Sequence, residues 1–192
     1  NVVTGQDRGL GAHLASHPGI SKVVFTGSTA TGRAVAQAAA SQLNGVVLEL
    51  GGKSPNIILD DADLEKAVST GVTICYSNAG QSCSVATRML VPRSKLEEVN
   101  EIAKRTAEAF VVGDPTKDET TMGPLVNARQ FKSVQGYIQT GIEEGGELLT
   151  GGVGRPDGLA KGFYTKPTIF TNVDPKSTIA QEEIFGPVLV II

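Results

Sequence analysis

A cysteine and a glutamate carry the most chemical information in this sequence. Cys83 ends the polar stretch Asn78–Cys83, and Glu49 lies upstream in the stretch Leu48–Pro55. A thiolate can bond to a carbonyl carbon, and a carboxylate can take a proton from water. We therefore interpret Cys83 and Glu49 as the nucleophile and the base of one covalent mechanism.

The two cysteines have different surroundings. Most cysteines outside disulfides are small buried hydrophobic residues, and Cys75, between Ile74 and Tyr76 at the end of an apolar helical pattern, fits that description. Cys83 follows a Gly-Gln-Ser stretch, where the backbone can turn sharply and leave the sulfur facing a cleft. An ordinary thiol, with a pKa near ~8.5, is mostly protonated at neutral pH. Catalysis by Cys83 would therefore need a nearby base, electropositive surroundings or stabilising backbone N–H groups.

Glu49 is the only charged residue in the apolar stretch Val46–Leu50. This stretch reads as a buried strand, and Glu49 lies near its carboxyl end, where functional groups gather in open α/β folds. A buried carboxylate is a better base for water than an exposed one. The alternative is a glutamate on an edge strand that faces water.

The stretch Phe25–Arg33 combines a strand end, a tight turn and a helix start. Free N–H groups at such a helix N-terminus suit a phosphate or pyrophosphate group. The stretch is only a near miss to a P-loop, because Arg33 and Ala34 stand where that motif has Lys and Ser or Thr. Alternatively, Gly27 and Gly32 simply allow the turn and close helix packing.

The predicted elements alternate between strands and helices, which indicates the α/β class. A strand, a helix and a second strand within the first 50 residues predict a parallel βαβ unit. The pair Gly51-Gly52 then marks a predicted domain boundary. Strands are predicted at 22–26, 46–50, 56–59 and 88–91, helices at 28–40, 63–76, 94–110 and 127–141, and a glycine-rich loop or hairpin at 145–162. The helix at 94–110 is expected to open with a capping box, Ser94–Glu97.

Composition excludes several classes of function. The chain of 192 residues has a formal net charge of −3 with scattered signs, so nucleic acid and anionic membranes are not expected partners. Its apolar runs are too short to span a bilayer. Two cysteines are too few for a disulfide framework and lack the spacing of metal ligands, so we expect no metal and a cytoplasmic location. His13 and His17 read as surface or packing residues, which argues against a Cys–His catalytic pair.

Both ends of the chain read as strands. Asn1–Val3 resembles the tail of a strand, and the apolar stretch Pro187–Ile192 stops inside another. Domains rarely end inside buried strands, because ladder groups are then left unpaired. We expect the sequence to be a segment of a longer protein.

Together, five ordered stretches resemble the aldehyde dehydrogenase superfamily, in its hydrolytic branch. They are spread over nearly the whole chain, and the ordered set is far more specific than any single member. The stretches are Phe25–Thr29, Leu48–Pro55, Asn78–Cys83, Met122–Leu125 and Glu182–Val188.

This resemblance implies roles at the matching positions. Cys83 would attack an aldehyde carbonyl to give a thiohemiacetal and then a thioester, with hydride passing to NAD or NADP. Glu49 would activate the water that hydrolyses the thioester. The implied cofactor-binding residues are Gly27 and Ser28 at the pyrophosphate, Glu183 and Phe185 at the nicotinamide ribose and ring, and Leu50 and Gly51.

The resemblance also implies a division of the chain and marks what it lacks. Residues 1–50 match the later part of a Rossmann-like, parallel-sheet cofactor domain, and residues 51–192 match most of an α/β catalytic domain. The family's upstream asparagine of the oxyanion hole has no counterpart here, so we expect little activity from these residues alone. A full-length relative is expected to form a homodimer or homotetramer and to take a small-molecule aldehyde.

Two other functions remain open at this point. One is a non-catalytic relative that keeps the fold for structural or binding reasons, and the intact pair of Cys83 and Glu49 argues against it. The other is a cysteine-dependent hydrolase or acyltransferase without a redox cofactor. The absence of a well-placed histidine and the turn at Phe25–Gly32 argue against this second alternative, and a dinucleotide-binding test would settle whether the protein uses a redox cofactor.

Overall fold

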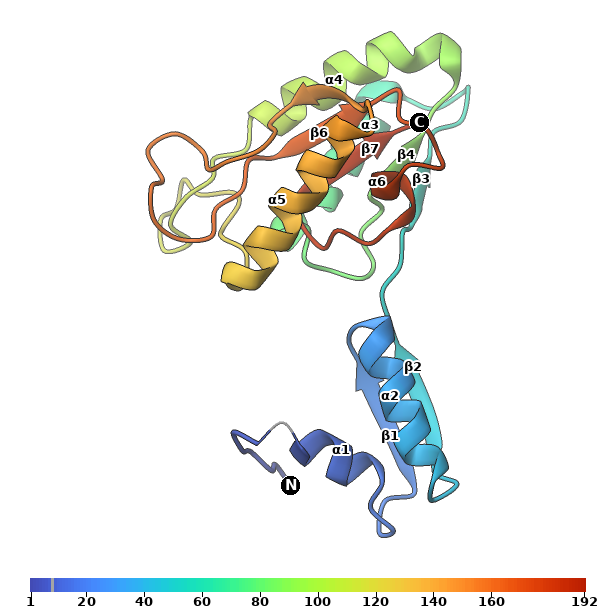
Figure 1. Cartoon of the computed structure of the whole chain (residues 1–192). Coiled ribbons are helices and arrows are strands. Elements are labelled where there is room, and N and C mark those ends of the chain that lie inside the picture. Colours follow the sequence, from blue (N-terminus) through green and yellow to red (C-terminus); the bar gives the residue numbers. More distant parts are fainter. Residues whose placement is uncertain (8) are drawn as a thin grey trace. The chain divides into compact units, whose positions relative to one another are not determined.

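The structure, a computed structural model, describes residues 1–7 and 9–192. The chain forms two compact units, Asn1–Gly51 and Gly52–Ile192 (Figure 1). Each unit is described by itself.

The first unit is built on two parallel strands. Its elements are α1 (Gly9–Ala15), β1 (Lys22–Thr26), α2 (Thr29–Ala40) and β2 (Gly45–Glu49). β1 and β2 pair in parallel, with Lys22 opposite Gly45 and Thr26 opposite Glu49. The predicted strand–helix–strand unit is therefore confirmed. The predicted strand tail at Asn1–Val3 is wrong for this chain, because these residues form no regular element.

Local sequence explains where α2 begins and how closely it packs. Ser28 caps the helix, and its hydroxyl oxygen accepts a hydrogen bond from the Thr31 N–H at 3.2 Å. A run of alanines then favours helix. Gly32 is buried, and a β-carbon there would collide with the Leu50 side chain at 2.5 Å. Gly32 therefore lets α2 approach the end of β2 closely, which is the packing role considered for it above.

The second unit contains a five-stranded sheet with the order β3-β4-β7-β6-β5. β5 and β6 form an antiparallel hairpin, and the other neighbouring strands are parallel. The strands are β3 (Pro55–Ile57), β4 (Arg88–Leu90), β5 (Glu147–Thr150), β6 (Thr168–Thr171) and β7 (Val188–Ile191). The helices are α3 (Leu64–Tyr76), α4 (Leu96–Glu108), α5 (Ala128–Glu143) and α6 (Thr178–Gln181), with short 3-10 turns η1 (Ser77–Gly80) and η2 (Arg93–Lys95).

The core of the second unit lies around its central strands. Every residue of β6 and β7 is buried, as expected for parallel strands covered on both faces. α3 packs on α4 and α5 on α6, and α5 passes in front of the strands in Figure 1. The buried Tyr76 hydroxyl donates a hydrogen bond to the Thr168 carbonyl at 2.9 Å, which ties the end of α3 to β6.

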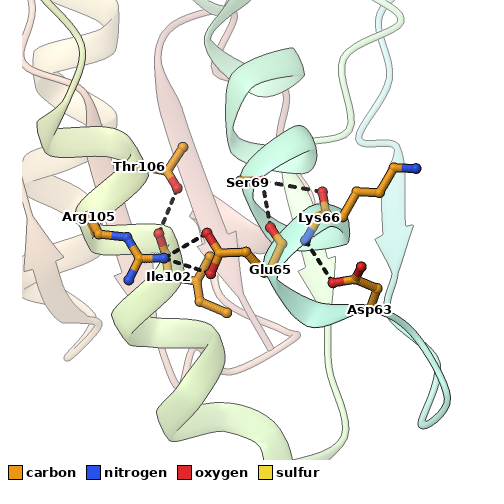
Figure 2. Close-up of polar contacts among 7 residues, drawn as sticks. All are labelled: Asp63, Glu65, Lys66, Ser69, Ile102, Arg105 and Thr106. Carbon is orange, nitrogen blue, oxygen red and sulfur yellow. Dashed lines mark hydrogen bonds and ion pairs between the residues drawn. The ribbon is translucent and has the colours of Figure 1, made fainter.

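Figure 2 shows the hydrogen bonds and the ion pair that polar groups form at the contact between α3 and α4. Asp63 caps α3 by accepting a hydrogen bond from the Lys66 N–H at 3.2 Å. Arg105 of α4 donates to both carboxylate oxygens of Glu65, at 2.8 and 2.7 Å. Both side chains of this pair are well exposed, so it contributes at most about 1 kcal/mol. The two helices are held together mainly by the hydrophobic core that they share, to which α3 contributes Val72 and α4 contributes Ile102.

One predicted helix start is wrong. α4 begins at Leu96 after the 3-10 turn Arg93–Lys95, and its N-cap residue, Lys95, makes no side-chain capping bond. Ser94 lies inside that turn, so its hydroxyl cannot form the expected capping box. The helix itself runs close to the predicted range, and the observed α/β architecture with parallel sheets confirms the predicted fold class.

Two further features concern membranes and metals. Within residues 1–7 and 9–192, each helix is too short or too polar to cross a bilayer. The same residues contain no group of three or more His, Cys, Asp or Glu side chains that could hold a metal ion.

Candidate active site

In the first unit, candidate groups meet at the carboxyl ends of β1 and β2. The Gly27 N–H donates to the Glu49 carbonyl at 3.0 Å, one residue beyond the pairing of Thr26 with Glu49. Ser28 follows at once and caps α2. The structure thus brings together three residues that the sequence singles out: Gly27, Ser28 and Glu49.

The start of α2 offers donors to an anion. The Ser28 hydroxyl and carbonyl accept from the N–H groups of Thr31 and Gly32. The N–H groups of Thr29 and Ala30 have no acceptor within the described residues, as expected for the first positions of a helix. These two donors, with the helix dipole behind them, suit a phosphate oxygen.

A cleft of about 530 Å³ opens between α1 and α2 of the same unit. Its walls are mostly small and apolar, and Phe25 of β1 contributes an aromatic ring. The lining residues on the helices include Ala12, Ala15, Thr31, Ala34 and Ala38. A cleft of this size and character suits a flat ring system beside the anion-binding turn.

Glu49 differs from the sequence prediction in one respect. Its side chain is exposed, whereas the prediction placed it at the end of a buried strand. β2 belongs to a sheet of only two strands, and four of its five residues are exposed. Leu50 is half-buried against Gly32, and Gly51 is exposed.

In the second unit, candidate groups precede the strands. Cys83 comes shortly before β4, and Glu183 and Phe185 come shortly before β7. β4 and β7 are neighbouring parallel strands, so their amino ends lie at the same edge of the sheet. A third connection reaches this edge, because a β-carbon on Gly52, just before β3, would lie 3.9 Å from the Cys83 carbonyl oxygen.

The turn before Cys83 is strained. Asn78, Ala79 and Gly80 all have left-handed backbones, with φ of 52°, 54° and 72°. Such a conformation costs a residue other than glycine about 1–3 kcal/mol, and it clusters at functional sites. At Gly80 a β-carbon would also overlap the Gly186 carbonyl. Only glycine therefore fits at this point, where the Cys83 turn touches the turn that carries Phe185.

The thiols of the second unit differ in the way the sequence predicts. Cys75 is completely buried, and this burial raises the pKa of its thiol to about 12, despite the opposing charge of Lys53. Cys83 is exposed, and both cysteines are free. The protonated Cys75 is therefore a packing residue, and Cys83 is the thiol that is open to solvent.

Lys53 is a residue of this site that the sequence reasoning missed. Its Nζ is buried without a hydrogen-bond partner in the described residues, as are Arg88 Nε and Glu183 Oε1. Burial lowers the pKa of Lys53 to about 8, and the nearby Arg88 cation lowers it further. A negative charge on Cys75 or on Glu183 would oppose this shift. Because burial keeps the Cys75 thiol protonated, the Glu183 carboxylate is the group that balances the charge of Lys53. The sequence held one signal for this role, because Lys53 is a single charged residue among small residues just before a strand.

Two glutamines were missed as well. Gln81 Oε1 accepts from the Val126 N–H at 2.8 Å, which links the Cys83 turn to the segment before α5. Gln130 of α5 donates to the carbonyls of Ile184 and Phe185 at 3.1 and 2.8 Å. These contacts join residues 45 to 55 positions apart, so no local pattern could reveal them.

The sequence model of the Aldehyde dehydrogenase family matches residues 1–192, the whole chain. The chain belongs to the aldehyde dehydrogenase family. The resemblance inferred from the five stretches is thereby confirmed.

Relatives support this membership along the full chain. A 3-succinoylsemialdehyde-pyridine dehydrogenase from Pseudomonas sp is 53% identical over 191 residues, which are 100% of this chain and 40% of the relative. The chain thus spans about 40% of the length of the curated relatives it matches.

Solved aldehyde dehydrogenases share the fold. A cysteine-to-alanine variant of aldehyde dehydrogenase C from Pseudomonas syringae, complexed with NAD+ and octanal, has a TM-score of 0.94 at 51% identity. It is matched over 95% of this chain and 38% of its own. An NAD+ complex from Mycobacterium tuberculosis has a TM-score of 0.90 at 49% identity, over 93% and 37% of the two chains.

Proposed function

We propose that the whole protein oxidises an aldehyde to a carboxylic acid with NAD as the hydride acceptor. The observation that carries the proposal is the exposed Cys83, on a strained turn packed against the turn of Phe185, in a chain of the aldehyde dehydrogenase family. The exposed Glu49, beside Gly27 and Ser28, supplies the second reactive group.

The residues present fit a dinucleotide. The Thr29 and Ala30 amides beside Gly27 and Ser28 would hold the pyrophosphate, and the apolar cleft between α1 and α2 would take a flat ring. Glu183 is half-buried, and its Oε1 has no hydrogen-bond partner in the described residues, so its carboxylate would have capacity to accept hydrogen bonds from ribose hydroxyls. NAD, when bound, supplies the acceptor for a hydride. We propose NAD because the similar structures hold NAD+.

Cys83 begins the proposed reaction. Its sulfur bonds to the aldehyde carbon while the carbonyl oxygen gains a proton, which gives a thiohemiacetal. Loss of a hydride and a proton from this group leaves a thioester on Cys83. Glu49 then takes a proton from water, and the resulting hydroxide adds to the thioester carbonyl. The C–S bond breaks, the acid departs and the Cys83 thiolate returns.

A steady-state assay of the whole protein tests the proposal. It should use an aldehyde panel that includes octanal and a semialdehyde, with NAD and NADP in parallel, beside the variants Cys83→Ala and Cys75→Ala. Reduced cofactor should appear with the natural protein, persist in Cys75→Ala and fall to background in Cys83→Ala. Dinucleotide binding without turnover of any aldehyde would instead favour the non-catalytic alternative. Acyl transfer or hydrolysis without dinucleotide binding would favour a cysteine hydrolase.

We also propose that the whole protein is a cytoplasmic homodimer or homotetramer. The exposed apolar residues Ile57, Leu59 and Ile74, around an edge of the second unit, support assembly. The two free cysteines support a reducing compartment. Light scattering on the purified whole protein measures its mass, and a monomer at micromolar concentration would refute the assembly. Because the chain spans about 40% of its relatives, we still expect little turnover from the 192 residues alone.

A further inference from the structure

We propose that Gln81 and Gln130 are positioning residues that fix the Cys83 turn and the Phe185 turn to one short segment of chain. This segment, Val126–Gln130, is called the brace below. The inference deepens the proposed function and rests on it, because it concerns the distance between the nucleophile and the nicotinamide-binding turn.

Gln81 holds the strained turn in two ways. Its side-chain Nε2 donates to the Asn78 carbonyl at 3.1 Å, and the Asn78 side-chain Nδ2 donates back to the Gln81 carbonyl at 3.0 Å. This reciprocal pair closes a ring around the left-handed residues. The Gln81 Oε1 then accepts from the Val126 N–H at 2.8 Å. The side chain of Gln81 thus both closes the turn and ties it to the brace.

Gln130 holds the other turn from the same segment. Phe185 has a φ of 55°, an unfavourable conformation that surrounding contacts must maintain. The Gln130 Nε2 donates to the Ile184 carbonyl at 3.1 Å and to the Phe185 carbonyl at 2.8 Å. Both side-chain hydrogens are therefore used on the backbone of this one turn.

The brace includes the capped start of α5, and the two turns touch directly. Asn127 caps α5 by accepting from the Gln130 N–H at 2.9 Å, which fixes the start of the helix. A β-carbon on Gly80 would overlap the Gly186 carbonyl, so backbone meets backbone where the turns meet. No flexible side chain separates them at that point. Their relative position is therefore set by the backbone and by the two glutamines on the brace.

This arrangement matters because hydride transfer depends steeply on distance. A misplacement of reacting groups by about 1 Å can cost about 100-fold in rate. Replacing either glutamine with methionine keeps the side-chain length but removes its hydrogen bonds. We expect Gln81→Met to lower kcat of the whole protein by about 100-fold and to slow alkylation of Cys83 by iodoacetamide without cofactor. Gln130→Met should lower kcat similarly while leaving that alkylation rate unchanged.

Gln135 provides a matched control in the same helix. Its Oε1 accepts from the Gly154 N–H, and its Nε2 donates to the Thr165 hydroxyl, so it also ties a loop to α5. Gln135→Met should lower the unfolding temperature without changing kcat or the alkylation rate. Gln81→Glu keeps the acceptor for the Val126 N–H and should recover part of the activity lost in Gln81→Met.

Three measurements separate the outcomes: kcat, the alkylation rate of Cys83 and the unfolding temperature. The inference is wrong if both methionine variants keep kcat and alkylation rates within about twofold of the natural protein. It is also wrong if Gln135→Met loses as much kcat as they do, because a general loss of packing would then explain the effect. Full aldehyde oxidation by Cys83→Ala would refute the proposed function instead, and the alkylation rates would still report whether Gln81 holds the turn.

Discussion

The two units use opposite ends of their parallel strands. In the first unit, Gly27, Ser28 and Glu49 lie at or beyond the carboxyl ends of β1 and β2. In the second unit, Cys83 and Phe185 lie before the amino ends of β4 and β7.

The difference shows what each kind of site requires. At a carboxyl end the chain passes directly into a helix. The first N–H groups of that helix have no acceptor within the helix, so they are available to bind an anion. At an amino end no such donors exist, and a loop must be shaped by other means. Here the loop is shaped by residues with left-handed backbones and by a backbone contact that only glycine permits. Side-chain amides also form hydrogen bonds to backbone groups 45 to 55 residues away in the sequence. The second site should therefore be far more sensitive to small substitutions.

The largest expected effect comes from replacing one reactive residue in each unit, Glu49 in the first and Cys83 in the second. Glu49→Gln should slow thioester hydrolysis by about 100- to 10,000-fold, the usual contribution of a general base. Reduced cofactor should then appear as a burst of one equivalent followed by slow turnover, whereas Cys83→Ala should show no burst. Rapid mixing with absorbance detection measures both. A steady state without a burst in Glu49→Gln would contradict its role as the base.

A second prediction concerns strain in the amino-end site. Gly80→Ala should destabilise the protein by about 3 kcal/mol, because alanine must adopt a left-handed backbone and its β-carbon meets the Gly186 carbonyl. Gly136→Ala is the matched control, since a β-carbon there meets nothing and α5 should gain about 0.5–1 kcal/mol. Denaturant unfolding measures both. Equal stability of the two variants would mean that the turn relaxes freely.

A third prediction uses the buried Lys53. Its pKa is about 8 in the folded protein and 10.5 in an ordinary lysine, so between these values the unfolded chain binds more protons. The free energy of unfolding should therefore gain up to about 1.4 kcal/mol per pH unit from this residue as pH rises from 8 to 10.5. Lys53→Met should lose this gain, and the exposed Lys22→Met should keep it. Parallel pH profiles for all three proteins would show that folding does not lower the pKa of Lys53.

The smallest expected effect compares two helix caps. Ser28→Ala and Asp63→Ala each remove the side-chain acceptor at a helix start, and each should cost about 1 kcal/mol of stability. Only Ser28→Ala should also weaken dinucleotide binding, because the start of α2 faces the proposed pyrophosphate. Calorimetric titration with NAD checks this. Equal NAD affinity in both variants would remove α2 from the cofactor site.

Local patterns were enough to predict much of the fold. Asp63 and Asn127 marked the starts of α3 and α5, and both side chains form the expected caps. The prediction that Ser94 caps α4 was wrong, because Ser94 lies within a 3-10 turn that precedes the helix. The local sequence does not distinguish this turn from a helix cap. Glu49 was expected at the end of a buried strand, but the degree of burial depends on how many strands join the sheet.

The candidate site was predictable only in part, for a physical reason. Cys83, Glu183 and Phe185 stand in recognisable stretches, and parallel pairing brings their connections to one edge. Gln81, Gln130 and Lys53 acquire their roles through tertiary contacts and burial. These contacts depend on which distant backbone groups arrive beside each side chain, and no local pattern in the sequence records that.

The connection between β5 and β6 is a suitable site for inserting a label or tag into this protein. Gly154 and Gly158 of this connection have left-handed backbones, and a β-carbon on either would meet nothing nearby. Point substitutions there would be strained, but a flexible glycine- and serine-rich insertion next to Gly158 would keep the glycine and extend into solvent. A fluorophore or affinity tag carried by such an insertion would report on the protein without touching Cys83, Gln81 or the brace.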